Sequence, residues 1–210
     1  MNAMLHMKTL LIPATTQGCR FTALGVFLLL AVSLSCVLVA PLAMPDSYSW
    51  FSNVISESAA QRVHSAWIAR LGFLLFGLAV LWLTVSLKPV WARGAYWMHM
   101  AFSVFMVGTA AFSHRPWLDN IPFDSFEDLL HSITATGMGF AFSLGIVVRL
   151  LQREKGEGPK RAFDAFALVA ATTLPLLGVV LPSMGGLFQR TMFIVAYLWY
   201  AHEALLVRKL

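Results

Sequence analysis

Four polar residues suited to a binding site follow the first long apolar run at near-helical spacing. The stretch from Trp50 to His64 reads WFSNVISESAAQRVH and carries Asn53, Glu57, Gln61 and His64 at offsets of 0, 4, 8 and 11. At about 3.6 residues per turn, these positions share one face of a helix. We interpret the row as ligand-binding. A short helix whose polar row only faces water is the alternative.

A second candidate site lies in the stretch FDSFEDLLHS, where Asp128 precedes His131 by three residues. On a helix this spacing lets the carboxylate hold one imidazole nitrogen and leave the other facing a neighbour. A histidine oriented in this way is a common general base, and Ser56 or a water would serve as the nucleophile. The acids Asp124 and Glu127 form a capping-box pattern, which explains them structurally.

Two arginines lie near the starts of apolar runs, where an unpaired charge is costly. Arg70 therefore needs an anion, and Glu57, Asp128 or the headgroup of a ligand are the candidates. We predict that Glu57, Arg70, Asp128 and His131 form one outward-facing site, and that Arg190 contributes to ligand binding.

The histidine spacing gives no support to a haem, and no metal-binding motif is present. His99 and His114 are 15 residues apart, about 60° out of line on a helix, and no second apolar run carries two histidines. None of the possible zinc ligands has the H-E-x-x-H spacing; these ligands are Glu57, His64, His114, Asp128 and His131. The sequence therefore predicts neither a metal nor another cofactor.

Other ionisable residues lie toward the opposite ends of the apolar runs. His99 and His202 are expected to pack or to reach water and headgroups at the cytoplasmic ends of their helices, and Glu203 to reach toward Arg208. Asp164 also lies toward this end of its apolar run.

The elements that position these side chains are predicted from composition. The 210 residues are 59% hydrophobic and 12% charged, with a mean hydropathy of +0.73, which is too apolar for an ordinary soluble domain. A membrane core of about 30 Å needs about 20 apolar residues in a helix. We expect an all-α polytopic membrane protein, in which one domain (1–210) forms a six-transmembrane-helix bundle with a short extra helix in the first outer loop. The predicted spans are 21–43, 67–87, 95–113, 129–150, 163–181 and 187–207.

Charge predicts the orientation of the bundle. With a cytoplasmic N-terminus, 11 of the 15 Lys and Arg residues fall on the inside, as the positive-inside rule requires. We therefore expect a multi-pass protein of a bacterial or archaeal cytoplasmic membrane, with both termini cytoplasmic. The net charge of +5 is concentrated in inner loops such as 149–161, which favours membrane lipids over nucleic acid as partners. The sequence does not identify protein partners.

Three stretches carry a resemblance to a known family: YSWFSNVISESAA (48–60), RLGFLLFGLAV (70–80) and FEDLLHSITA (126–135). With them the chain resembles the bacterial and archaeal membrane proteins of domain-of-unknown-function family 998 (DUF998). The first motif of that family reads like Asn-Thr-Ile-Ser-Glu-Leu-Gly, so Asn53, Ile55, Ser56 and Glu57 match, whereas Ser58 and Ala59 replace Leu-Gly. A more distant likeness links the chain to the six-spanning Frag1/DRAM group. The resemblance implies a six-helix fold and an outward polar site, and it supplies no known reaction.

Three functions are consistent with these features. The first is binding or moving a lipid or other small amphiphile, with Arg70 and Glu57 anchoring its headgroup. The second is a membrane-embedded hydrolase or transferase that uses His131 and Asp128 as the base. The third is a structural or partner-binding subunit without chemistry of its own. Polar groups that converge over an apolar cavity are typical of small-ligand sites, so we favour the first.

Overall fold

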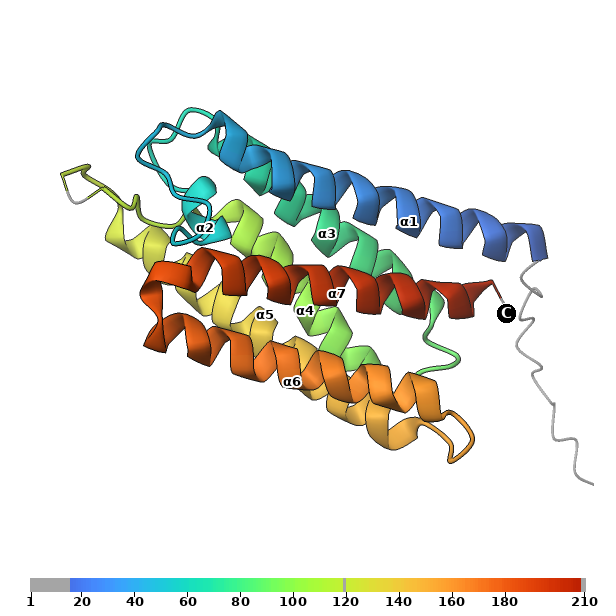
Figure 1. Ribbon diagram of the computed structural model, residues 1–210. Coiled ribbons are helices and arrows are strands. Elements are labelled where there is room, and N and C mark those ends of the chain that lie inside the picture. Colours follow the sequence, from blue (N-terminus) through green and yellow to red (C-terminus); the bar gives the residue numbers. More distant parts are fainter. Residues whose placement is uncertain (1–15, 119, 209–210) are drawn as a thin grey trace, which may run out of the picture.

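A computed structural model describes residues 16–118 and 120–208 of the chain. In these residues every regular element is a helix, and six long helices lie alongside one another (Figure 1). They are α1 Thr16–Val39, α3 Ala66–Ser86, α4 Arg93–Ala111, α5 Ser125–Gln152, α6 Gly158–Val180 and α7 Gly185–Val207. The short α2, Ile55–Ser58, lies between α1 and α3, and single 3-10 turns cover Ala40–Ala43 and Pro182–Met184. The all-α class and the short extra helix are confirmed for the described residues.

Each predicted span lies largely within one observed helix. One boundary differs from the prediction: α5 begins at Ser125, whereas the predicted span begins at residue 129. The carboxylate of Asp124 accepts hydrogen bonds from the backbone N–H groups of Phe126 (2.8 Å) and Glu127 (3.2 Å), so the helix begins before its apolar run. The predicted domain limits, 1 and 210, lie outside the described residues. So do Lys8 and Lys209, two of the 11 Lys and Arg residues predicted to lie on the inside.

Four helical segments are long and apolar enough to cross a membrane. They are Gly18–Ala43, Ala66–Ser86, Ser125–Gln152 and Gly158–Val180. Large apolar side chains face outward from them, among them Leu24, which is 54% exposed. A protein surrounded by water rarely exposes such continuous apolar surface, whereas a bilayer favours it. The chain is therefore a membrane protein with several apolar helices.

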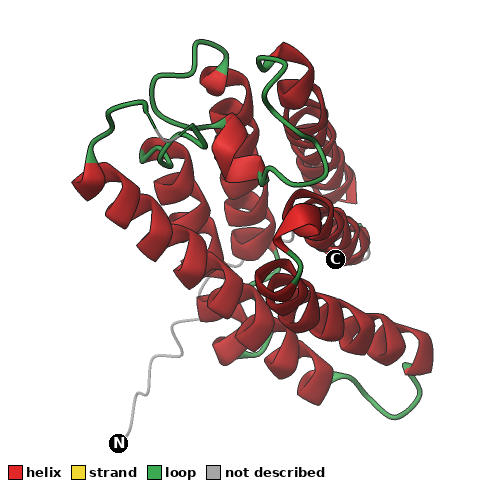
Figure 2. Ribbon diagram, turned by 60° about the vertical axis from the view of Figure 1, so that its left-hand side comes forward, coloured by secondary structure: helices red, strands yellow, loops and turns green. Residues whose placement is uncertain are grey.

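The six long helices close into a ring. Each packs on the next in chain order, and α1 packs on α7 (Figures 1 and 2). Aromatic side chains fill the interior: Phe76 stacks on Tyr197 with ring centroids 4.0 Å apart, and its edge meets Tyr200. Bulky rings at the centre bury large apolar areas and hold the helices at fixed separations.

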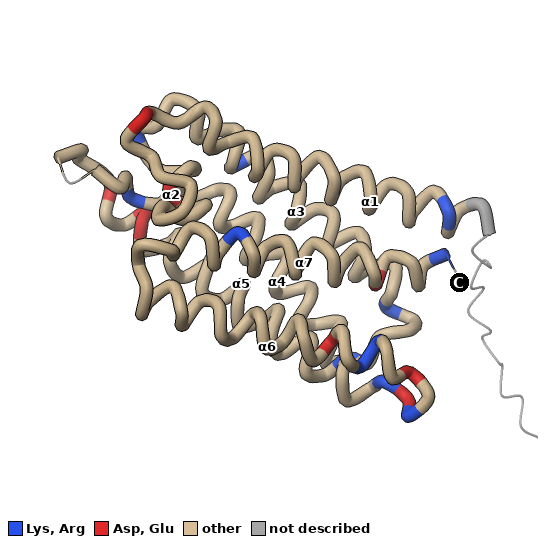
Figure 3. The backbone as a smooth tube through the Cα atoms, in the orientation of Figure 1, with Lys and Arg blue, Asp and Glu red and all other residues tan. Residues whose placement is uncertain are grey.

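Charged residues gather toward the two ends of the bundle (Figure 3). One end, here called the α2 end, carries α2 and the α4–α5 connection (112–124). At the other, the termini end, α1 begins and α7 ends (Figure 1). The predicted candidate residues lie at the α2 end, because they flank the helix ends that meet there.

Candidate functional site

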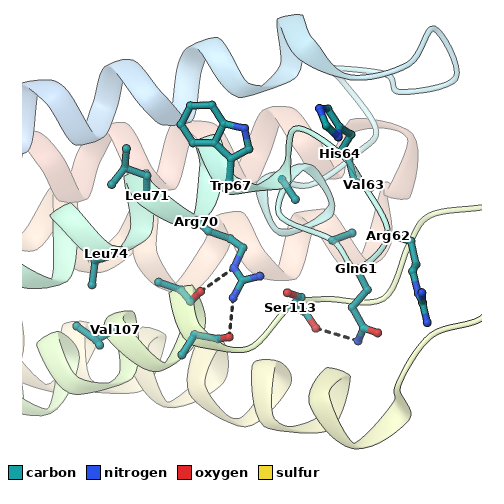
Figure 4. A pocket seen from close by; sticks show the side chains of 14 residues that line it. Gln61, Arg62, Val63, His64, Trp67, Arg70, Leu71, Leu74, Val107 and Ser113 are labelled. Atoms are coloured by element: carbon teal, nitrogen blue, oxygen red, sulfur yellow. Dashed lines mark hydrogen bonds between the residues drawn. The ribbon is translucent and has the colours of Figure 1, made fainter.

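A groove of about 530 Å³ lies between α3 and α4 at the α2 end (Figure 4). We call it the α3–α4 groove. Apolar side chains form its wall along the helices, including Trp67, Leu71, Leu74 and Val107. Polar side chains lie nearer the loops, and these are Gln61, Arg62, His64, Arg70 and Ser113. The groove therefore combines an apolar channel with a basic mouth.

Arg70 stands between these two parts of the groove. Its Nε donates to the carbonyl of Ala110 (2.9 Å) and its Nη2 to that of Ala111 (2.8 Å), the last two residues of α4. The carboxylates predicted as possible partners, those of Glu57 and Asp128, are therefore replaced by the carbonyl end of a helix, which carries partial negative charge. The third guanidinium nitrogen, Nη1, donates no hydrogen bond among the described residues. It remains available to a ligand.

The predicted pairing of Asp128 with His131 is wrong. The Nδ1 of His131 donates instead to the carbonyl of Phe112 (2.8 Å), and the carboxylate of Asp128 accepts from the backbone N–H of Arg115 (2.8 Å). His131 thus satisfies a carbonyl that the end of α4 leaves unpaired, and Asp128 satisfies a backbone N–H of the α4–α5 connection. The imidazole is buried, and no described residue forms a hydrogen bond with its Nε2. No hydrogen bond joins Ser56 to either residue in the described part of the chain.

The row of four polar residues does not form one helical face, because α2 is a single turn. The carboxylate of Glu57 folds back to accept from the backbone N–H of Val54 (2.7 Å) and from the side-chain amide of Asn53 (3.0 Å). Glu57 therefore caps its own helix and is not positioned as a headgroup anchor. His64 is exposed beside the α3–α4 groove.

Gln61 joins the loop after α2 to the α4–α5 connection. Its amide nitrogen donates to the carbonyls of Asp124 (2.9 Å) and Ser113 (3.3 Å), and its amide oxygen accepts from the backbone N–H of Asp124 (2.7 Å). The Gln61–Ser113 bond is visible in Figure 4. The side chain is 9% exposed, so its role is to hold the mouth of the groove together.

Arg190 lies beneath the loop before α2 and is 2% exposed. Its Nη1 donates to the carbonyls of Trp50 (2.7 Å) and Asn53 (2.8 Å), its Nη2 donates to the hydroxyl of Tyr48 (2.6 Å), and the guanidinium faces the Trp50 ring. Burial raises the pKa of Tyr48, which keeps this hydroxyl protonated. Arg190, predicted as a ligand contact, is occupied by the loop that it positions.

The structure contains a second polar cluster, at the termini end, that the sequence did not predict. The carboxylate of Glu203 accepts from Arg149 Nε (3.1 Å) and Nη2 (2.9 Å), from Arg153, and from the indole of Trp91 (3.0 Å). Asp164 accepts from Arg153 Nε (2.8 Å). We call Arg149, Arg153, Asp164 and Glu203 the ionic cluster; all four are at most 5% exposed. Two positive and two negative charges are thus buried together in pairs.

The structure at the termini end corrects the expectation for Glu203 and decides the one for His99. Glu203 pairs with Arg149 and Arg153 rather than reaching toward Arg208. His99 takes the first of its two predicted roles, packing rather than reaching water, because it is buried and shares a hydrogen bond with the hydroxyl of Tyr200 (2.9 Å). Arg149 and Arg153, four residues apart, would share one helical face, and that spacing was the signal in the sequence that could have revealed the cluster.

Among the described residues, no group of three or more His, Cys, Asp or Glu side chains lies close enough to hold a metal ion. The donors at the α2 end are instead arginine, imidazole and amide nitrogens, which suit an anionic or hydrogen-bond-accepting group.

The comparisons with known proteins give one match. A family model described as "Protein of unknown function (DUF998)" matches residues 15–205. No curated protein and no solved structure matches the chain. The likeness to the Frag1/DRAM group is not confirmed.

Proposed function

We propose a function from the geometry of this chain itself, because the chain belongs to the DUF998 family, whose function is unknown. The protein binds an anionic amphiphile in the α3–α4 groove. One observation carries the proposal: the groove has an apolar wall along the helices and a free guanidinium nitrogen of Arg70 at its mouth.

The wall of the groove fits an acyl or isoprenoid chain. Leu71, Leu74 and Val107 line it on two neighbouring helices. Trp67, at the first turn of α3, is 61% exposed, a position that suits the boundary between hydrocarbon and headgroups. A tail lying along α3 and α4 would cover apolar surface that faces lipid in any case.

The mouth of the groove fits a negative headgroup. Arg62 and Arg70 both line the groove, and none of its described lining residues is acidic. The helix end that holds Arg70 fixes the guanidinium before a ligand arrives, so little side-chain freedom would be lost on binding. Glu57, Arg70, Asp128 and His131 were predicted to form one site. Of these four, only Arg70 lines the groove, together with His64 and Arg62.

We further propose six membrane spans, both termini on the cytoplasmic side, and a bacterial or archaeal cytoplasmic membrane as the location. An even number of antiparallel helices supports a shared side for the two ends, and the Lys and Arg residues of 149–161 support the cytoplasmic one. A cysteine placed at Lys155 should stay unlabelled by an impermeant reagent in whole cells. Labelling from outside would overturn this orientation.

Binding is tested with the purified full chain and lipids of matched acyl chains, measured by native mass spectrometry. Phosphatidylglycerol should bind more tightly than phosphatidylcholine, and Arg70→Gln should remove that preference. Arg70→Lys keeps the charge and should retain more of it, although the two helix-end hydrogen bonds weaken.

A matched pair of variants separates binding from folding. Leu74 and Leu78 are 36% and 40% exposed on the same helix, but only Leu74 lines the groove. Leu74→Trp should lower phosphatidylglycerol affinity by about tenfold, or about 1.4 kcal/mol, whereas Leu78→Trp should not. Equal affinities for the two variants would refute the groove as the binding site.

A further inference from the structure

A second groove adjoins the first at the α2 end. It has a volume of about 510 Å³ and lies between the end of the first 3-10 turn, the segment before α3, and the α4–α5 connection. We call it the loop groove. Its lining includes Met44, Arg62, His64, Pro116, Trp117 and Ile121. Arg62, Val63 and His64 line both grooves, so they form the ridge between them.

The ridge has an unusual backbone. Arg62 has a φ of 64°, in the left-handed region that a non-glycine residue seldom adopts. Glycine would adopt this conformation without the steric cost, yet the chain places a long cationic side chain there. Strain of this kind, held in place by the surrounding structure, is often found where a side chain serves a ligand.

The loop groove also contains a donor without an acceptor. The indole Nε1 of Trp117 is buried and has no hydrogen-bond partner among residues 16–118 and 120–208, although buried donors are nearly always paired. The ring is fixed by an edge-on contact with Tyr48, at 5.2 Å between centroids, and Arg190 holds the hydroxyl of Tyr48. The ring of Trp117 is therefore held in a fixed position in the wall of the loop groove.

We infer that the loop groove is the headgroup subsite of the same amphiphile, and that the ligand is a phosphodiester rather than a terminal phosphate. This inference rests on the proposed function. The tail lies in the α3–α4 groove, the phosphodiester anion faces Arg70 and Arg62, and the polar group beyond it enters the loop groove. There it accepts a hydrogen bond from Trp117 and contacts His64. No described residue lining either groove is acidic, which suits an anionic link between tail and head.

The test compares short-chain phosphatidylglycerol with phosphatidic acid of the same acyl chains, titrated onto the purified full chain. Phosphatidic acid has the phosphate and the tails but no headgroup beyond the phosphate. Wild type should bind phosphatidylglycerol more tightly. Trp117→Phe removes only the indole donor, so it should lower phosphatidylglycerol affinity by about 3- to 10-fold, the value of one hydrogen bond, and leave phosphatidic acid unchanged.

Trp67→Phe is the matched control, because Trp67 lines only the α3–α4 groove. It should change the affinities for both lipids by the same factor. Inorganic phosphate should compete weakly with either lipid, since it lacks the tail. Tight binding of inorganic phosphate alone would contradict an amphiphile site.

Arg62 gives an independent readout. Arg62→Gly relieves the left-handed backbone, so it should raise the thermal unfolding temperature while lowering phosphatidylglycerol affinity. Arg62→Lys should retain most of the affinity. Unchanged affinity in Arg62→Gly would overturn the assignment of Arg62 to the phosphodiester.

The outcomes separate the two proposals. Equal affinities of wild type for the two lipids, unaffected by Trp117→Phe, would overturn the headgroup subsite and leave the α3–α4 groove standing if Leu74→Trp still differs from Leu78→Trp. Failure of both lipids to bind would overturn the proposed function itself.

Discussion

Replacing Glu203 with glutamine should destabilise the protein more than any other change of one carboxylate to an amide. The carboxylate is fully buried and accepts hydrogen bonds from Arg149, Arg153 and Trp91. Glutamine preserves the size, but its neutral amide leaves Asp164 as the only carboxylate in the described part of the chain that pairs with either of the two buried guanidinium groups. Removing one partner of a buried ion pair costs about 3–5 kcal/mol, and we expect a loss in this range.

Denaturant titration of the purified protein in detergent, followed by tryptophan fluorescence, measures the loss. Glu157→Gln is the control, because Glu157, the N-cap of α6, pairs with Lys160 in the first turn of that helix, with about 30% of each side chain exposed. An exposed pair of this kind contributes at most about 1 kcal/mol. The same chemical change should therefore have very different effects at the two sites.

A double variant tests the charge argument itself. Arg149→Gln in the Glu203→Gln background leaves Arg153 and Asp164 as a neutral pair, so the double variant should be more stable than the sum of the single losses predicts. Coupling of about 0.5–3 kcal/mol is usual for residues in one network. A Glu203→Gln loss below about 1 kcal/mol, or strictly additive losses, would refute the view that charge balance holds the termini end together.

Three further predictions concern the remaining contacts. Gly186→Ala should destabilise the protein by about 1–3 kcal/mol, because its new methyl group would overlap the carbonyl oxygen of Asn53 and meet Arg190 Nη1 at 2.7 Å. Gly139→Ala is the control: no described atom lies within 4 Å of its new methyl group, so it should be neutral or stabilising in thermal unfolding. Equal effects of the two variants would contradict the close approach of Gly186 to Asn53. Gln61→Glu should lower the free energy of unfolding by about 1–3 kcal/mol and speed hydrogen exchange in the α4–α5 connection, since the carboxylate cannot donate to the carbonyls of Ser113 and Asp124. Unchanged hydrogen exchange would contradict this role of Gln61. The hydrogen bond from Lys160 lowers the pKa of Glu157, so this pair contributes stability above the unfolded-state pKa of about 4.3 and loses it as pH falls through the lower folded-state pKa. The free energies of unfolding of wild type and Glu157→Gln should therefore differ most near neutral pH and converge in acid. A difference that does not change with pH would refute the linkage.

The helices could be predicted from the sequence because their signals are local. Apolar runs of about 20 residues indicated six long helices, and Asp124 indicated the start of α5 through hydrogen bonds to residues two and three positions later. The loop residue Glu57 was different. Its spacing fitted a long polar face, but a carboxylate one turn into a helix also caps that helix, and here the cap formed.

The site could be predicted only in part, because a spacing on one helix does not say what stands opposite. Asp128 and His131 were expected to pair with each other, yet the backbone of the neighbouring α4–α5 connection offered both of them better partners. Arg70 was expected to need an anion, with Glu57, Asp128 or the headgroup of a ligand as candidates, and carbonyls at the end of α4 took the place of the two carboxylates. The residue types therefore predicted where polar side chains lie, but not which groups they bind.

The sequence by itself determined the membrane class, the helices and the end of the bundle at which polar residues collect, because hydropathy and capping act over a few neighbouring residues. Only the tertiary structure decided which charges are neutralised and where a ligand could enter. Arg149 and Glu203 are 54 positions apart, and Arg190 and Trp50 are 140 apart. Such contacts depend on how the helices pack in a ring, and a buried charge or backbone group takes whichever partner that packing brings within reach.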